Sequence, residues 1–451
     1  MQSGQLGLIL VLAMVIGAVV TRKVELCIIT VSMIACIYLY GANFITQWCL
    51  LLQETLENNA WVMLLVGIFG SLIALIQASK GHLGFSRIID RLCKSERKTL
   101  FVTFIMGVLI FMDEFMNVLT ISACMKNHYD KEKIPREALA FLLNSTGTPV
   151  CVLIPVSGWG ICYISIFMEE EGFQALGPDG IVNYLKAVPF CFYPIFLLIV
   201  VLLFCAGVMP KLGGMKKAYD RVRLTGQLYD ERNRKYNQQT DDDELGEGSV
   251  ADFIIPMVVM IVIAVVTGDL IPATVIAIAV CLVMYVPRKI ISLGDFFPTI
   301  VKGFGDMLPV LSILLLTYQF QIIVEKLYLT EYLIELVKPY MISFLFPMIV
   351  FILVAGLCFC TASLLGICAL VSPIVFPLGA AVGANTILIM AAIISGGAFG
   401  SHACFYSDVT IVTSNCAGIS NIDHALSQFP YVIISAVLSI IAFAVAGLIM
   451  T

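Results

Sequence analysis

A series of long apolar segments constrains this chain more than any other feature of its sequence. A segment that crosses a bilayer needs roughly 20 apolar residues. Such segments lie near 5–21, 26–44, 60–79, 137–167, 183–208, 252–268, 270–287, 304–325, 385–412 and 429–450. Only 13% of the residues are charged, against about a quarter in soluble domains, and no basic patch suits nucleic acid. The sequence predicts an all-α, multi-pass membrane protein in contact with the lipid bilayer.

Two further apolar regions, 99–127 and 340–380, are interrupted by polar or small residues. Basic loops at 79–98 and 126–137 flank the first region, and both predict a cytoplasmic position because Lys and Arg accumulate on that side. A segment that starts and ends on one side is a re-entrant helical hairpin, with a single long tilted helix as the alternative. The same charge rule predicts that both termini are external, and we expect the protein in the cell membrane (plasma or inner membrane).

A polar stretch at 209–250 separates two halves of the chain, and we expect a solvated, partly disordered cytoplasmic linker there. The halves, 1–208 and 251–451, each contain two closely spaced spans, a third span, a hairpin, a broken span and a closing span. The offset is about 245 residues, which is typical of a duplicated architecture. Because the first half crosses an odd number of times, the pattern predicts inverted structural repeats with about ten crossings and two hairpins. The discontinuous transmembrane helices are expected at about 137–167 and 385–412.

The stretch Ser395–Ser414, SGGAFGSHACFYSDVTIVTS, is the most unusual part of any span. It places His402 and Asp408 inside an apolar segment, where titratable groups are costly and therefore functional candidates. Its two consecutive glycines predict where the helix opens, because irregular backbone at membrane depth must line a cavity or packed protein. We interpret it as the break of a discontinuous helix with an ion or substrate site. Asn144–Gly160 is its counterpart in the first half.

The two breaks and the two hairpin tips are expected to meet at one site. Sodium needs several oxygens to replace its water shell, which carbonyls and Ser, Thr and Asn side chains supply, while a carboxylate supplies the countercharge. A carboxylate removed from water also binds a proton more readily, so sodium and protons can compete for it. Asp113 and Asp408 are the expected sodium ligands. The ion or substrate candidates are Asp113, Glu114, Asn117, Asn144, Ser145, Thr146, Thr361, Ser363, His402, Asp408 and Thr410.

Each candidate also has a purely structural interpretation. Asp113 or Glu114 could lie at a helix end that faces water, and Asp408 could cap the N-terminus of a half-helix. His402 fits a hydrogen-bonded packing residue better than a proton shuttle, and Ser and Thr side chains often bond to their own helix backbone. The aromatic residues that serve either as packing groups or as faces for an organic cation are Trp159, Phe405 and Tyr406.

The run GSHACFYSDVT, Gly400 to Thr410, resembles the signature of the NhaC-type sodium/proton antiporters, which reads roughly G-D-H-C-S-P-I-S-D-T-T. The segments MDEFMN, KIPREALAFLLNSTGTPVCVLIPVSGWG and NIDHALSQFPY are similar to other motifs of that family, and the resemblance extends over most of the chain. It implies the ion-transporter superfamily fold: a scaffold and a transport domain with two hairpins and two broken helices, a homodimer, and an elevator mechanism. The positions that carry over are Asp113, His402, Ser407, Asp408 and Thr410, with a looser match at Asn144, Ser145 and Thr146.

Some positions of the run depart from the family pattern. Ser401 replaces a typically acidic residue, Ala403 replaces Cys, and Phe405 and Tyr406 replace Pro-Ile. Because these changes remove a carboxylate and enlarge the site, Ser401, Phe405 and Tyr406, together with Trp159, are candidate determinants of substrate selectivity.

Two transport functions remain open from the sequence. One is sodium/proton antiport by alternating access, and the other is sodium- or proton-coupled transport or exchange of a small organic solute, an amino acid or a carboxylate. Neither needs a cofactor beyond the coupling ions. An enzyme is not expected, because the sequence contains no HExxH, GxSxG or P-loop motif.

Overall fold

The computed structural model describes residues 2–21, 23–81, 93–111, 113–155, 157–237, 249–267, 269–329, 331–332, 335 and 342–450. Every regular element within these ranges is a helix. Six of the described helices are long and apolar enough to cross a membrane, or up to eight spans exist if two bent pairs each count as one. The chain is therefore a helical, multi-pass membrane protein, as the sequence predicts. Most of the basic loop at 79–98 and residues 238–248 of the linker lie outside the described residues.

The elements follow one another along the chain in two halves. The first half contains α1 (Gln2–Thr21), α2 (Val24–Tyr40), α3 (Phe44–Asn58), α4 (Ala60–Ala78), α6 (Glu96–Leu109), α7 (Glu114–Lys131), α8 (Arg136–Thr146), α9 (Thr148–Cys151), α10 (Gly158–Phe167), α11 (Glu171–Gln174), α12 (Gly180–Ala187) and α13 (Phe192–Cys205). The linker contains α14 (Gly213–Thr225) and the 3-10 helix η3 (Glu231–Tyr236). The second half contains α15 (Val250–Thr267), α16 (Leu270–Tyr285), α17 (Leu293–Asp306), α18 (Leu308–Lys326), α20 (Phe346–Thr361), α21 (Leu364–Ala381), α22 (Thr386–Ala403), α23 (Asp408–Ala417) and α24 (Asn421–Met450).

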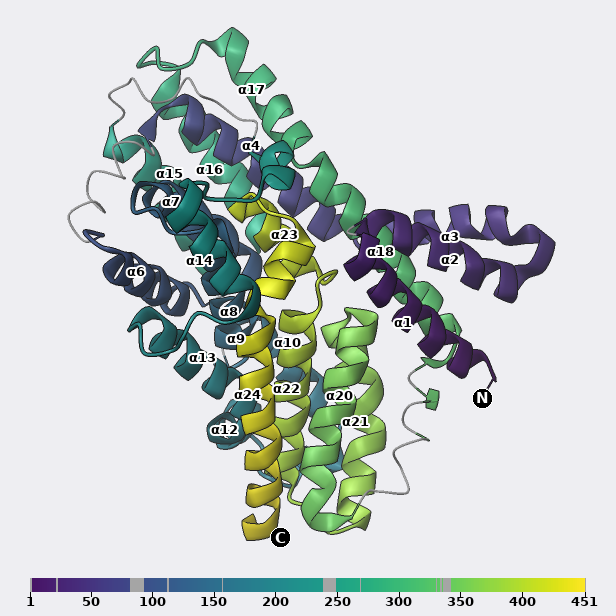
Figure 1. The fold of residues 1–451 in the computed structure, drawn as a ribbon. Helices are drawn as coiled ribbons and strands as arrows, with labels where there is room; N and C mark the ends of the chain where they lie inside the picture. The colour runs from purple at the N-terminus through teal and green to yellow at the C-terminus, as the bar shows by residue number, and fades with distance from the viewer. Residues whose placement is uncertain are drawn as a thin grey trace.

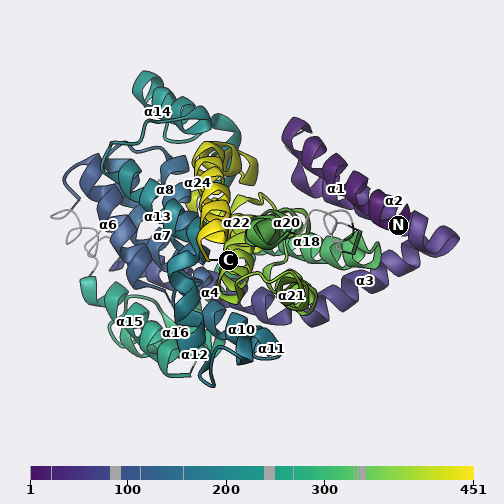
Figure 2. The same cartoon turned by 90° about the horizontal axis from the view of Figure 1, so that it is seen from below.

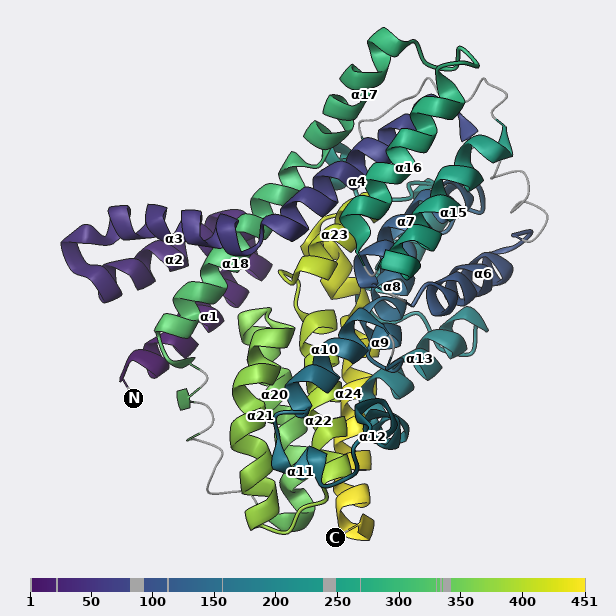
Figure 3. The ribbon, with the colours of Figure 1, turned by 180° about the vertical axis from the view of Figure 1, so that it is seen from behind.

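Three groups of helices can be distinguished in Figures 1 and 3. Helices α4, α15, α16 and α17 pack together at one end of the molecule, and α20, α22 and α24 pack with α13 at the other. Helices α1 to α3 form an arm that packs on α18. The view along α24 shows this arm on the side opposite α15 and α16 (Figure 2). The arm has its own apolar cluster with α18, separate from the main core.

Glycines allow α4 and α17 to pack in direct backbone contact. A Cβ atom at Gly303 would lie 2.5 Å from the carbonyl oxygen of Gly70 and 2.7 Å from the Cβ of Ala74. The Ser71 hydroxyl donates a hydrogen bond to the Ile300 carbonyl across the same interface, at 2.9 Å. Small residues serve this purpose in membrane helices because lipid gives no hydrophobic drive for association, so close packing has to supply it.

The chain reverses direction between α6 and α7. The side-chain amide of Asn117 in α7 donates to the carbonyls of Gly107 (2.7 Å) and Ile110 (2.8 Å) at the end of α6. In a continuous helix, residues 107 and 117 would be about 15 Å apart along the axis, so these bonds require a turn. Helices α20 and α21 are joined through Ala362, which adopts a left-handed conformation with φ 54°. Because α20 and α21 are each long enough to cross a membrane, the re-entrant depth of this second pair stays a prediction.

Both expected broken helices contain a break, and the two breaks are built alike. Helix α10 begins at Gly158 and α23 at Asp408, an offset of 250 residues, and both are ten residues long. The hydroxyl of the residue before each helix donates to a carbonyl six residues back: Ser157 to Cys151 (2.6 Å) and Ser407 to Ser401 (2.7 Å).

The expected role of the two consecutive glycines in this region was wrong. Helix α22 continues through Gly396 and Gly397, and it opens only after Ala403. A Cβ atom at Gly396 would lie 2.8 Å from the Cβ of Val354 on α20. These glycines therefore provide close helix packing and not a break.

Three other regions differ from the sequence-based expectation. Residues 44–58 and 293–306 form helices α3 and α17, although their polar residues excluded them from the predicted spans. The closing segment near 183–208 is bent by 55° at Cys191, between α12 and α13. The bend is tolerated because irregular backbone at membrane depth can be satisfied by neighbouring helices.

The described part of the linker is packed and not a solvated connector. Arg221 of α14 donates two hydrogen bonds to the Glu137 carboxylate of α8, at 3.0 and 2.9 Å. The Asn237 amide donates to the Gly418 carbonyl at the end of α23 (2.6 Å). Within the linker, the hydrogen-bonded Arg232 guanidinium holds the pKa of Asp230 well below its usual range. Specific polar contacts thus order a segment whose composition suggests disorder.

Candidate ion-binding site

The turn between α6 and α7 carries two adjacent carboxylates, beginning with Asp113. Asp113 is the N-cap of α7, and its Oδ1 accepts hydrogen bonds from the backbone N–H groups of Phe115 (2.8 Å) and Met116 (3.1 Å). Asp is favoured at this position because its oxygen satisfies donors that the first helical turn leaves open. Asp113 is half-buried, and its Oδ2 accepts no hydrogen bond from any described residue. Asp113 therefore lies at a helix end and still has one oxygen available.

Glu114 lies deeper than Asp113 and is only 1% exposed. The Thr148 hydroxyl, just after the break at Gly147, donates to its Oε2, and the Trp159 indole of α10 lies beside the same carboxylate. Within the described residues, the enclosed Oε1 has no hydrogen-bond partner. The turn between α6 and α7 and the break after α8 therefore meet at this carboxylate, which keeps an oxygen without a partner among the described residues.

Asp408 begins α23, directly after the second break. The Tyr318 hydroxyl of α18 donates to its Oδ2 at 3.0 Å, and its Oδ1 accepts from the backbone N–H of Val409 at 2.7 Å. Both the capping interpretation and the ion-binding interpretation fit this position, because a carboxylate at a helix N-terminus is stabilised by the helix dipole and can still bind a cation.

The packing of α7 against α23 brings the carboxylates of Asp113, Glu114 and Asp408 within electrostatic range of one another. No Lys or Arg among the described residues forms an ion pair with any of the three. Like charges in a water-poor site repel strongly, so the cluster is stable only when protons or another cation reduce its charge.

A polar network lies next to this cluster and is centred on Asn144 of α8. Its Nδ2 lies 3.2 Å from the His402 carbonyl, 3.3 Å from the Thr410 hydroxyl, 3.1 Å from His424 Nε2 and 3.2 Å from Gln428 Oε1. An amide nitrogen has two protons, so it can donate to only two of these four at once. The network joins both broken helices to α24.

His402 is enclosed, and both of its ring nitrogens are engaged. Nε2 lies 3.1 Å from the Ser145 hydroxyl and Nδ1 lies 2.7 Å from the Tyr193 hydroxyl. This arrangement fixes the end of α22 to α8 and α13. The geometry matches the interpretation of His402 as a hydrogen-bonded packing residue.

The aromatic pair after α22 is packed away from the carboxylates. The Tyr406 hydroxyl is within hydrogen-bonding distance of the carbonyls of Phe359 (2.9 Å) and Cys360 (2.7 Å) at the end of α20. The Phe405 and Tyr406 rings pack edge to face at 5.1 Å, and both belong to the apolar cluster around α18. Of the four selectivity candidates, only Trp159 lies at a carboxylate, while Ser401 contributes its backbone carbonyl to Ser407.

The remaining hydroxyl candidates bond mainly to their own backbone. Thr146 donates to the Leu142 carbonyl (2.8 Å) and Thr361 to the Leu357 carbonyl (2.9 Å). Ser363 follows Ala362 at the turn between α20 and α21, and its backbone N–H donates to the Thr361 hydroxyl at 3.3 Å. No hydrogen bond joins the second hairpin tip to the three carboxylates within the described residues.

Several residues of the site were not among the sequence candidates: Thr148, Tyr193, Tyr318, His424 and Gln428. His424 and Gln428 could have been found, because they are four residues apart and so share one face of an apolar helix. The two tyrosines carried no signal in the sequence, since a tyrosine in a membrane helix has many possible positions.

The described residues contain no group of three or more His, Cys, Asp or Glu side chains arranged to hold a metal ion. A transported cation would therefore draw most of its ligands from other oxygens. Two such atoms are present, since the enclosed Oδ1 of Asn117 and Oδ1 of Asn144 have no hydrogen-bond partner in the described part of the chain. Buried acceptors of this kind are rare in native structures, and a donor or a cation would satisfy them.

The fold and site define a multi-pass helical membrane protein with an unneutralised carboxylate centre where two interrupted helices meet. The model of the Na+/H+ antiporter family matches residues 150–448, more than half of the chain. The chain belongs to this family of cation/proton antiporters, as its resemblance to the NhaC-type antiporters predicts. The match includes His402 and Asp408 but not Asp113 or Glu114.

The chain is also similar over most of its length to a bacterial protein whose name states no substrate. An uncharacterized protein of Haemophilus influenzae is 23% identical over 424 residues, which cover 87% of this chain and 79% of that protein. The similarity extends over most of both chains, so the two proteins resemble each other as whole molecules.

Proposed function

We propose that this protein exchanges sodium for protons, and that Asp408 is the carboxylate for which the two cations compete. The observation that supports this most is the cluster of Asp113, Glu114 and Asp408, which has no cationic partner among the described residues. Either protons or sodium can reduce its charge, but full occupancy by both is disfavoured because each neutralises the same carboxylates. Competition of this kind couples the two fluxes without covalent chemistry.

Sodium would be held by the carboxylates of Asp408 and Asp113 together with buried oxygens that have no donor among the described residues. Asp408 and Asp113 provide charge, with the Oδ2 of Asp113 directed away from its capping bonds. The Oε1 of Glu114 and the Oδ1 of Asn117 are enclosed and unsatisfied. Weak ligation by a few such oxygens suits a cargo ion, which must be released again on the other side.

For the architecture we infer inverted repeats over 1–208 and 251–451, with the hairpins at 99–127 and 340–380. Two observations support this. The paired breaks share an offset of 250 residues, and the hairpin helices pack reciprocally, α7 on α23 and α21 on α10.

Alternating access would follow as an elevator movement of the hairpins and broken helices against the group that contains α4, α15, α16 and α17. The resemblance to the NhaC-type antiporters further implies a homodimer, and the distribution of Lys and Arg favours a cell-membrane orientation with both termini external.

Cysteine labelling tests the topology. Single cysteines placed at 79–81 and at 131–133, on a background without exposed native cysteines, should react from the same face of the membrane. Reaction from opposite faces would contradict the first hairpin.

Proteoliposome flux measurements test the function. An imposed sodium gradient should move protons, and Asp408→Asn should abolish that movement. The matched control is Asp269→Asn: Asp269 caps α16 at an exposed turn, and Asn caps equally well. Full activity of the Asp408 variant would refute the assigned role.

A second candidate, coupled transport of a small organic solute, is favoured by one contact. The Trp159 indole lies beside Glu114, which places an aromatic ring next to the carboxylates, and an organic cation could bind to such a ring. If proton flux ignores both sodium and lithium while a sodium or proton gradient drives uptake of a solute, this second function is correct and the first is wrong.

A further inference from the structure

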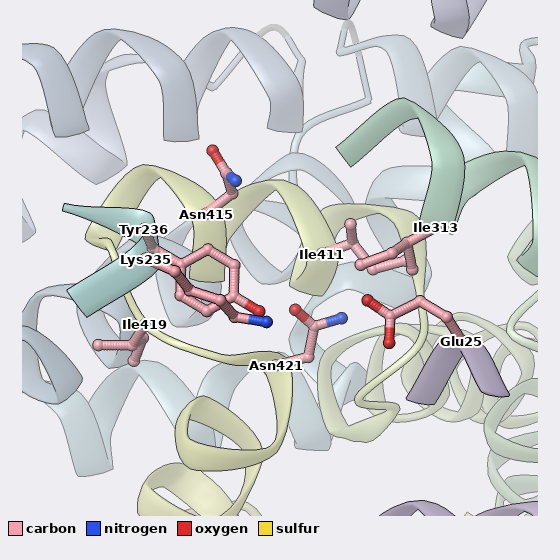
Figure 4. A pocket seen from close by; sticks show the side chains of 8 residues that line it. All are labelled: Glu25, Lys235, Tyr236, Ile313, Ile411, Asn415, Ile419 and Asn421. Atoms are coloured by element: carbon pink, nitrogen blue, oxygen red, sulfur yellow. The ribbon is translucent and has the colours of Figure 1, made fainter. Parts of the chain in front are cut away.

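A cavity of about 320 Å³ lies beside α23, separate from the three carboxylates. It is formed where α2, α18, α23 and α24 meet the linker helix η3 (Figure 4). This volume is at the small end of the range for ligand pockets, about 300–1,000 Å³. The lining residues are Glu25, Lys235, Tyr236, Ile313, Ile411, Asn415, Ile419 and Asn421.

The first indication of a ligand is the side chain of Asn421. Asn421 is 8% exposed, and its Oδ1 accepts a hydrogen bond from the Ser414 hydroxyl at 2.7 Å. Its Nδ2 has no partner among the described residues and extends into the cavity in Figure 4. Native structures seldom leave an enclosed donor unmatched, so an acceptor from a ligand would complete this site.

The second indication is the pair of opposite charges on facing walls. Figure 4 shows Lys235 on one side of Asn421 and Glu25 on the other. Neither side chain forms an ion pair or hydrogen bond with another described residue, although the Lys235 ammonium lies 4.8 Å from the centre of the Tyr236 ring. Their charges are thus available to a molecule that carries both signs.

Apart from Asn415 and Tyr236, the remaining wall is apolar, and its side chains come from three different segments. Ile313 belongs to α18, Ile411 to α23, and Ile419 to the turn between α23 and α24. These three branched side chains can pack against an aliphatic group, and they have no polar atom that could bind a charged group.

We propose that this cavity binds a small zwitterion with an apolar tail, such as an aliphatic α-amino acid. The ammonium group would lie at Glu25, and the carboxylate would accept hydrogen bonds from Lys235 and from the Nδ2 of Asn421. The tail would lie against the three isoleucines. A ligand with only one of the two charges would leave Glu25 or Lys235 without its partner.

This site is close to the ion site but distinct from it. Ile411 follows Asp408 by three residues on α23, so the cavity begins about one helical turn from that carboxylate. The proposal goes beyond sodium/proton exchange and does not depend on it, because binding can be measured without any gradient.

The test compares three probes on the purified full-length protein in detergent. L-leucine has both charges, 4-methylpentanoate lacks the ammonium group, and 3-methylbutylamine lacks the carboxylate. Leucine should raise the thermal unfolding midpoint, and each analogue should bind at least about tenfold more weakly, the equivalent of one lost charge contact. Absence of a leucine effect, or equal effects of the three probes, would overturn the proposal.

Two variants locate the binding in this cavity. Glu25→Gln should remove the preference for leucine over 4-methylpentanoate, and Lys235→Met should remove the preference for leucine over 3-methylbutylamine. The exposed residues Glu57 and Lys216 give the controls Glu57→Gln and Lys216→Met, which should keep both preferences. Misfolding would weaken the binding of all three probes together, whereas loss of one charge changes only one preference. If both cavity variants keep the preferences of the unmodified protein, the proposed site is wrong. If either variant fails to fold, the probe series on the unmodified protein decides.

Discussion

Replacing Tyr318 with Phe removes one hydroxyl group and leaves the ring in place. That hydroxyl donates to Asp408 Oδ2 at 3.0 Å, and Tyr318 is only 7% exposed. A donor stabilises the ionised carboxylate and not the protonated acid. In Tyr318→Phe the ionised form loses this support, so the proton is held more tightly and leaves Asp408 only at higher pH.

The size of the effect follows from the strength of that bond. A hydrogen bond to a charged group contributes about 1.5–3 kcal/mol, and one pH unit corresponds to about 1.4 kcal/mol. The loss of this hydrogen bond therefore corresponds to a shift of about 1–2 pH units in the proton release from Asp408. Because Asp408 is partly exposed and water can replace some of the lost bond, we expect a shift near the lower end, about 1 pH unit.

The assay is sodium-driven proton movement in proteoliposomes, measured across a pH series. The pH of half-maximal exchange should move to the alkaline side, while the maximal rate changes less. The control is Tyr328→Phe, which removes a hydroxyl from an exposed tyrosine just after α18 and should leave the profile unchanged. An unchanged or acid-shifted profile in Tyr318→Phe would refute the claim that this bond acts on the ion-binding carboxylate.

Two further predictions concern stability. Arg221→Met leaves the Glu137 carboxylate, which is only 5% exposed, without its ion-pair partner. The midpoint of thermal unfolding should therefore fall by the equivalent of about 3 kcal/mol. The control Arg223→Met breaks an exposed ion pair and should change this midpoint little. Gly400→Ala places a methyl group against α20, where Cys358 and the Phe359 backbone lie, and should destabilise the protein by about 1–3 kcal/mol. Gly356→Ala, with open space around it, should be neutral or slightly stabilising in the same unfolding measurement, and equal losses in the two variants would contradict the packing of α22 on α20.

The sequence predicted those parts of the fold that depend on local properties of the chain. Apolar length located most helices, because a bilayer requires it of any span. Charge in an apolar segment identified Asp113, Glu114 and Asp408, since few structural reasons exist for such residues. Helices α3 and α17 were missed because each mixes apolar and charged residues, and only their partners α2, α18 and α4 show which faces are buried.

The rest of the site depends on tertiary contacts that local patterns do not encode. The Tyr318 hydroxyl reaches Asp408 across 90 residues of sequence, and Tyr193 reaches His402 across 209. The paired glycines at 396 and 397 were misread for the same reason, because glycine serves close packing as well as helix breaks and only the neighbouring helix distinguishes the two. In the described part of the linker, the mixed charge forms specific ion pairs, although the same composition is equally typical of disorder.

The proposed repeat contains two equivalent helix junctions, and the carboxylates lie at only one of them. With the offset of 250 residues, Asp113 corresponds to Ser363 and Asp408 corresponds to Gly158. The two reciprocal contacts, α7 on α23 and α21 on α10, are therefore equivalent in architecture and different in chemistry. The first brings carboxylates from both halves together, while the corresponding positions at the second are a serine and a glycine. A duplicated fold thus retains two similar helix junctions, and only one of them has the charge that a cation requires.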